Sequence, residues 1–216
     1  MQIGNPPIRV QSAQLIIGSD ECGYGSWAGP LLVVAVCVPL DWEPPPGLTD
    51  SKKLTEGRRE ALMKLLQADP RVRYTDAWTT PEVIDKLGVY QANIAAHKHV
   101  HGKFPEPDCL HVADGNLDLG PDIVSTPKAD MLIPACSAAS VIAKVLRDKL
   151  MTKLDETYPG YGFKKSKGYG VPAHMAALKE LGPCKAHRMS YEPVARAAKP
   201  KTLVDIFGAM DELTQE

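Results

Sequence analysis

Apolar residues gather in short runs near the start of the chain. Residues 15–19 and 31–38 are rich in Ile, Leu and Val, and each run has the length of a buried strand. A turn rich in glycine, with Gly23, Gly25 and Gly29, lies between them. The two runs are therefore predicted to pair as an antiparallel hairpin. Residues 71–78, 109–115 and 122–127 predict three further short strands.

Apolar residues recur at helical spacing in several later segments. In residues 56–68, Leu62, Leu65 and Leu66 are predicted to share one helix face. Pro81 is predicted to open a helix that continues to about His99. Its expected apolar stripe is Val83, Ile84, Leu87, Ile94 and Ala95. The longest amphipathic stretch covers 129–158, with the expected core stripe Ala135, Ala139, Ile142, Leu146 and Leu150. A short helix is predicted at 174–181.

This order of strands and helices predicts an α/β fold with a mixed sheet, because hairpin strands are antiparallel and strands separated by helices tend to be parallel. A chain of 216 residues, 44% of them hydrophobic, is long enough for one domain with a real core and a small appendage. The formal net charge of -1 means that any polyanion site must be a local patch.

Cysteine usage and hydropathy indicate the compartment. The five cysteines include no C-x-x-C pair, which fits a reducing compartment and no zinc site. The N-terminal residues lack a basic segment followed by a long apolar run, and no apolar run reaches the ~20 residues of a membrane span. We therefore expect a cytoplasmic protein without a membrane partner.

Acidic residues follow or begin the predicted elements at separate places in the chain. Asp20 and Glu21 follow the first strand, Asp114 ends the strand at 109–115, and Asp130 begins the long helical stretch. Sites in α/β sheets collect outside the carboxyl ends of strands, so these side chains are expected to meet. Carboxylates can share a site when a divalent cation offsets their repulsion, and an all-oxygen ligand set suits Mg²⁺ or Mn²⁺. Taken alone, Asp114 or Asp130 would more often be a cap or a solvated turn residue.

Six stretches, in order, resemble the type 2 ribonucleases H, the ribonuclease HII family. They are "GSDECGYGSWAGPLLVVAV", "LTDSKKLTEGRREAL", "VADG", "SAASVIAKVLRDKLM", "YPGYGFKKSKGYGVPAH" and "HRMSYEPV". The resemblance covers about residues 15–195 and implies a ribonuclease H-like fold, a mixed five-stranded sheet flanked by helices, with a small C-terminal helical extension. Residues 1–14 would then be an N-terminal extension and 196–216 a C-terminal tail.

The resemblance also implies an activity. It is the two-metal hydrolysis of RNA in RNA/DNA hybrids, with cutting on the 5′ side of ribonucleotides embedded in duplex DNA, and 3′-hydroxyl and 5′-phosphate ends. The implied metal ligands and catalytic residues are Asp20, Glu21, Asp114 and Asp130. The implied substrate contacts are Gly23, Tyr24, Gly25, Ser51, Lys52, Lys144, Arg147, Lys167 and Tyr169. Alternatives are a hybrid-binding module of the same fold that does not cut, and another metal-dependent nuclease. We expect a monomer.

Two details qualify the implied site. The family commonly has Gly-Arg-Gly where this chain has Gly23-Tyr24-Gly25, and a tyrosine lacks the charge and bidentate fork of arginine. Tyr24 could also simply fill space in the turn. His187 and Arg188 are expected to support the site rather than to transfer protons. The alternating histidines at 97, 99 and 101 are expected on different helix faces and not in a metal site.

Overall fold

The structure, a computed structural model, describes residues 13–199. Its centre is a five-stranded sheet with the strand order β3-β2-β1-β4-β5. The strands are β1 (Leu15–Cys22), β2 (Leu31–Pro39), β3 (Arg73–Thr79), β4 (Cys109–Asp114) and β5 (Val124–Thr126). β1, β2 and β3 pair in antiparallel fashion, whereas β4 and β5 run parallel to β1. The predicted mixed sheet is confirmed.

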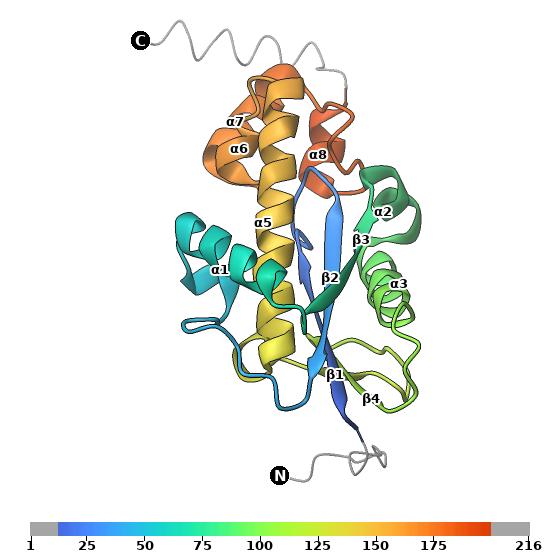
Figure 1. The fold of residues 1–216 in the computed structure, drawn as a ribbon. Coiled ribbons are helices and arrows are strands. Elements are labelled where there is room, and N and C mark those ends of the chain that lie inside the picture. The colour runs from blue at the N-terminus through green and yellow to red at the C-terminus, as the bar shows by residue number, and fades with distance from the viewer. Residues whose placement is uncertain (1–12, 200–216) are drawn as a thin grey trace, which may run out of the picture.

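Helices cover both faces of this sheet (Figure 1). The long helix α5 (Pro134–Thr157) and helix α1 (Glu56–Ala68) pack on one face, and α3 (Val89–His101) packs on the other. Shorter helical pieces are η1 (Ser51–Lys53), α2 (Pro81–Leu87) and α4 (Ala129–Leu132). The C-terminal helices α6 (Phe163–Ser166), α7 (Pro172–Leu181) and α8 (Glu192–Ala197) gather at one end of α5.

Alternation along β1 divides the core into two layers, because successive residues of a strand face opposite sides. Ile16 packs with the α1 and α5 layer, and Ile17 packs with the α3 layer. Helix α5 lies very close to β1, since a Cβ at Gly18 would lie 2.4 Å from the backbone nitrogen of Cys136. The close approach places the first turns of α5 beside the middle of the central strand.

Three local predictions were wrong. The helix expected from Pro81 to His99 is two helices, because the chain turns at Gly88, whose φ of 76° lies outside the helical range. The apolar stripe predicted for this single helix is therefore also wrong. Ala95 is exposed, and the buried face of α3 carries Ala92, Ala96 and Val100. Leu65 of α1 is also exposed, and Met63 is buried in the core with Leu62 and Leu66.

The long stretch at 129–158 is divided as well. Pro134 begins α5, and the preceding residues form the separate short helix α4. Of its expected stripe, Ala135, Ala139 and Ile142 are fully buried, whereas Leu146 and Leu150 are partly exposed.

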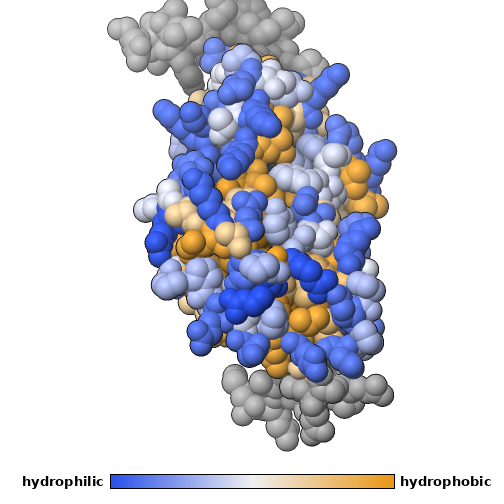
Figure 2. All heavy atoms as spheres, in the orientation of Figure 1, coloured by the Kyte–Doolittle hydropathy of each residue, from blue (hydrophilic) through white to orange (hydrophobic). Residues whose placement is uncertain are grey.

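Within residues 13–199, no helix is both long and apolar enough to cross a membrane. The face seen in Figure 2 carries hydrophilic side chains over most of its area, with apolar side chains in separate patches between them. Most of the predicted N-terminal extension and most of the predicted tail lie outside the described residues, so those boundaries stay predictions.

Candidate metal centre and active site

Sheet register brings two of the predicted acids together. β1 and β4 are parallel, and Ser19 pairs with Ala113, so the next residues, Asp20 and Asp114, are neighbours on the same face of the sheet. β1 continues to Cys22, so Asp20 and Glu21 lie within the strand and not after it, as the sequence had suggested. The antiparallel partner of Asp20 is Val34 on β2. Asp20 therefore lies on the central strand, and only 6% of its surface is exposed.

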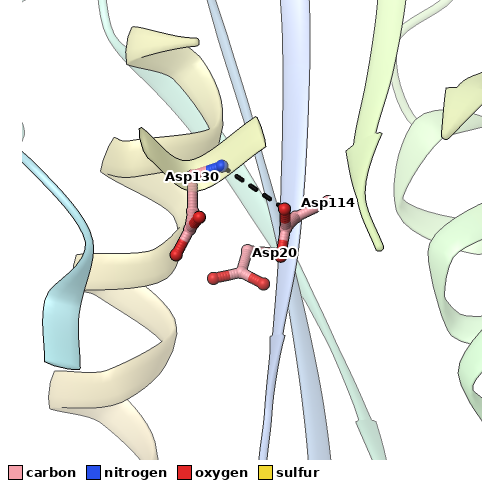
Figure 3. Close-up of side chains that lie close together, drawn as sticks. All are labelled: Asp20, Asp114 and Asp130. Atoms are coloured by element: carbon pink, nitrogen blue, oxygen red, sulfur yellow. Dashed lines mark hydrogen bonds between the residues drawn. The ribbon is translucent and has the colours of Figure 1, made fainter. Parts of the chain in front are cut away.

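Helix α4 contributes the third acid. Asp130 lies in its first turn, and the Asp130 backbone N–H donates to Asp114 Oδ1 over 3.4 Å (Figure 3). Carboxylate oxygens of Asp20, Asp114 and Asp130 all lie within 4.8 Å of one another. Three segments that are far apart in sequence thus bring their carboxylates to one point between the sheet and the start of α5 (Figure 3).

These carboxylates disfavour one another's charge. Burial raises the pKa of Asp20 well above its usual range, and the charges of Glu21 and Asp114 raise it further. Burial, followed by the charges of Asp114 and Asp50, also raises the pKa of Asp130. Although its own partial burial acts in the opposite direction, the pKa of Lys52 is raised, chiefly by Asp20 and Asp50. The site holds an excess of negative charge that one lysine does not balance.

Glu21 lies on the opposite face of β1 from Asp20. Its Oε2 is 3.9 Å from His97 Nε2 on helix α3, and its side chain is 27% exposed. Burial raises its pKa, and the charges of Asp114 and Asp130 raise it further, so the carboxylate still senses these two aspartates. The structure therefore brings three of the predicted acids close together. It places the fourth, Glu21, beside them on the face of the sheet that packs against α3.

A divalent cation fits this donor set. Every candidate ligand is a carboxylate oxygen, which hard cations such as Mg²⁺ and Mn²⁺ prefer. A bound cation would remove the repulsion that raises the pKa of Asp20 and Asp130. The buried cluster thus has the chemistry of a metal site.

Two arginines hold the turn at Gly23-Tyr24-Gly25. Arg188 is fully buried and donates to the carbonyl oxygens of Gly23 and Tyr24 over 2.7 and 2.8 Å. Arg147 is also fully buried, and it donates to the carbonyls of Ala28, Pro30 and Lys167. The two buried guanidinium groups therefore fix the main chain that connects β1 to β2. The expected supporting role of Arg188 fits this geometry.

Arg147 consequently differs from its expected role as a phosphate contact. Its guanidinium is enclosed and its donors are used by main-chain carbonyls, so we assign it to holding the loops around the site. Ser51 is similar. It is 4% exposed, and its hydroxyl accepts from the Ser140 hydroxyl over 2.9 Å.

The expected lysine contacts lie at the rim. Lys144 Nζ is 2.8 Å from Asp148 Oδ1, and Lys167 Nζ is 3.9 Å from Asp148 Oδ2. Arg59 reaches the same carboxylate at 3.7 Å. Asp148 is thus surrounded by three cations and orients two of the expected phosphate contacts, a role that the sequence analysis did not assign. Lys52 is exposed on η1, next to the acids.

Tyr169 is presented at the surface by a chain of histidines. Tyr169 is 37% exposed, and the guanidinium carbon of Arg147 lies 5.8 Å from the centroid of its ring. The Cys184 N–H donates to His187 Nδ1, so the other ring nitrogen of His187 faces His174 at 3.1 Å. His174 Nδ1 then donates to the Tyr169 carbonyl over 2.9 Å. His187 supports the loop of Tyr169 through His174.

A protein-family match identifies the kind of enzyme to which this site belongs. The family model for ribonuclease HII matches residues 17–194, which include all four acids. The chain belongs to the ribonuclease HII family. Over 204 residues it is 42% identical to a ribonuclease HII from Hyphomonas neptunium, in a match that covers 86% of this chain and 97% of the relative.

Solved structures agree in fold. The ribonuclease H2 from Pyrococcus horikoshii OT3 matches with a TM-score of 0.70 at 23% identity, over 85% of this chain and 97% of that one. The Bst-RNase HIII complex with Mn²⁺ matches with a TM-score of 0.68 at 16% identity, over 92% and 76%. The predicted ribonuclease H-like fold is confirmed. Ribonuclease HII membership also confirms the predicted enzyme class, a metal-dependent endoribonuclease that degrades the RNA of RNA/DNA hybrids.

One histidine prediction was wrong. His97 and His101 lie four residues apart on α3, so they share a face, and both contact the Ser19 hydroxyl at 2.8 Å. His99 is exposed on another face. The spacing of four was the available signal, but the position of Ser19 opposite α3 could not be known before the sheet was built.

Proposed function

We propose that this ribonuclease HII hydrolyses phosphodiester bonds with two divalent metal ions held by Asp20, Glu21, Asp114 and Asp130. The ions would be Mg²⁺ or Mn²⁺. The observation that carries the proposal is the convergence of three carboxylates within 4.8 Å, two of them on buried residues and one on the partly buried Asp114, with the fourth beside them. When bound, such ions activate a water and stabilise the charge that develops at the phosphate.

The residues of the chain supply binding and orientation. Lys52, Lys144 and Lys167 would contact the phosphates, with Asp148 holding the last two in place. Tyr169 would stack on a sugar next to the cleavage site. The main-chain groups at Gly23 and Gly25 would contact the substrate, and the approach is open at Gly25, where no atom lies within 4 Å of a Cβ built on the backbone.

We further propose that the enzyme cuts on the 5′ side of ribonucleotides embedded in duplex DNA and leaves 3′-hydroxyl and 5′-phosphate ends. Tyr24 lacks the guanidinium that the family commonly has at this place, so recognition of the junction would use the backbone of the turn. Arg188 keeps two of these carbonyls fixed. A cytoplasmic location, a monomeric state and the catalytic domain boundaries 15–195 complete the proposal.

Cleavage of two end-labelled duplexes tests the proposal. One duplex carries a single ribonucleotide and the other a long RNA strand, and each is assayed in Mg²⁺ and in Mn²⁺. Asp20→Asn and Asp114→Asn are expected to abolish cleavage, because a metal ligand is lost, and to leave duplex binding measurable by fluorescence anisotropy, because the phosphate-contacting lysines remain. Asp118→Asn, an exposed acid in the loop after β4, is the matched control and should cleave normally. Normal rates in Asp20→Asn would contradict the assignment.

A further inference from the structure

A line of polar side chains runs behind the metal centre, on the α3 face of the sheet. It connects Glu21, His97, Ser19, His101 and His111. The Ser19 hydroxyl lies 2.8 Å from His97 Nδ1 and 2.8 Å from His101 Nε2, and His101 Nδ1 lies 2.9 Å from His111 Nδ1. Ser19, His97 and His101 are each at most 3% exposed. A buried polar chain of this length requires that its hydrogens be arranged consistently.

One buried atom in this line has no hydrogen-bond partner among residues 13–199. It is His97 Nε2, which is buried and lies 3.9 Å from Glu21 Oε2. A buried polar atom without a hydrogen bond costs free energy unless it interacts with a polar or charged group next to it. The nearest charged group is the Glu21 carboxylate, which accepts hydrogen bonds and repels a nitrogen lone pair.

We propose that His97 is a positioning residue for Glu21: it presents an Nε2–H to the Glu21 carboxylate, and a one-directional chain of hydrogen bonds from His111 fixes that hydrogen in place. The inference rests on the proposed function in so far as Glu21 is a metal ligand. It adds a group that would orient the one acid lying apart from the three aspartates.

The direction of the chain follows from donor and acceptor counting. His97 and His101 are buried, burial favours the uncharged ring, and an uncharged imidazole carries one N–H. With its hydrogen on Nε2, His97 must accept at Nδ1, and the Ser19 hydroxyl is the donor there. Ser19 has no second hydrogen, so it must accept from His101 Nε2–H.

The same counting extends to the last member. His101, protonated at Nε2, accepts at Nδ1, and His111 must then donate from its own Nδ1. Every opposite arrangement leaves the lone pair of His97 Nε2 facing the Glu21 carboxylate. The chain therefore predicts the Nε2–H tautomer for His97 and His101 and the Nδ1–H tautomer for His111.

Long-range ¹H–¹⁵N correlation spectra of the full chain without metal test this pattern, because they distinguish the two tautomers of each ring. His→Gln variants assign the six histidines. The expected result is Nε2–H for His97 and His101 and Nδ1–H for His111. An Nδ1–H tautomer or a charged ring for His97 at neutral pH would overturn the proposal.

Calorimetric titration with Mn²⁺ tests the effect on the metal centre. His97→Leu removes the donor and is expected to weaken Mn²⁺ binding by about 10- to 100-fold, the usual effect of losing a group that orients a ligand. His97→Gln keeps an N–H donor and should restore most of the affinity. His99→Leu, on the exposed face of the same helix, should bind as the wild type does. A folded His97→Leu protein with unchanged Mn²⁺ affinity would overturn the proposal.

Two further variants separate this inference from the proposed function. Ser19→Ala keeps the His97 ring and removes the group that fixes its tautomer, so it should give mixed His97 tautomers and weaker Mn²⁺ binding even if His97→Leu fails to fold. A single Nε2–H tautomer of His97 in Ser19→Ala would overturn the role of the chain. Asp20→Asn tests the metal site itself. If it binds Mn²⁺ normally, the proposed function fails, and the tautomer spectra still decide the hydrogen-bond chain.

Discussion

Tyr169 is expected to contact the substrate directly through its exposed ring. Its backbone carbonyl is held by His174, and Arg147 lies below its ring. The ring can therefore keep one orientation while 37% of the residue remains exposed. Such a preorganised aromatic group loses little conformational freedom when a sugar or base stacks on it.

Tyr169→Phe is expected to retain most of the activity and Tyr169→Ala to lose it. Stacking on an aromatic ring contributes about 1–3 kcal/mol, which corresponds to roughly a 5- to 150-fold loss of kcat/KM in the alanine variant. Steady-state cleavage of a labelled hybrid measures both. Equal losses in the two variants would show that the hydroxyl, and not the ring, is the group in use.

The turn between β1 and β2 is the element on which the site depends most. Gly23 has a φ of 91°, and a Cβ there would lie 2.1 Å from Nε of the enclosed Arg147. Arg147 cannot move away without losing its three carbonyl partners. The Gly23 position thus joins the turn, the long helix and the C-terminal helices.

Gly23→Ala is expected to lower the free energy of unfolding by at least about 1–3 kcal/mol, the cost of a non-glycine residue in a sparsely populated backbone region, and the contact with Arg147 adds to it. Gly25→Ala is the matched control. Gly25 has no heavy atom within 4 Å of the added Cβ and a backbone that other residues adopt, so stability should stay within about 0.5 kcal/mol. Urea denaturation followed by circular dichroism compares the two, and equal stability would contradict the packing argument.

At the scale of the whole molecule, buried neutral histidines connect stability to pH. Burial, together with the neighbouring His174, lowers the pKa of His187 to about 4. The unfolded chain therefore binds a proton at higher pH than the folded chain does. The contribution of His187 to stability is present above pH 6.5 and is lost as the pH falls toward 4. The acid cluster acts in the opposite direction, because protonation of Asp20 relieves repulsion in the folded state.

A variant isolates the histidine contribution. The difference in the free energy of unfolding between the wild type and His187→Gln is expected to narrow as the pH falls from 6.5 to 4, since only in the wild type does unfolding free a ring at position 187 to bind a proton in that interval. Urea denaturation of the metal-free proteins at several pH values measures it. A difference that stays constant with pH would mean that His187 does not titrate in this range.

The sequence by itself predicted the strands and the mixed sheet, and it singled out four acids, three of which the structure brings within 4.8 Å of one another. These are local properties, since apolar runs, glycine turns and acids next to strands are readable without knowing what lies beside them. It also indicated a helix after Pro81 and a long one after Asp130, but it missed the breaks at Gly88 and before Pro134. Element boundaries depend on single residues whose effect is set by the packing around them.

Only the tertiary structure decided what surrounds each charged group. Arg147 and Lys167 looked alike as basic residues, yet the first is enclosed by carbonyls and the second reaches Asp148 at the rim. Asp20 and Glu21 are adjacent in sequence, yet strand alternation sends one toward Asp114 and the other toward His97. The physical reason is that burial, register and hydrogen-bond partners come from residues distant in sequence, which only the folded chain brings into contact.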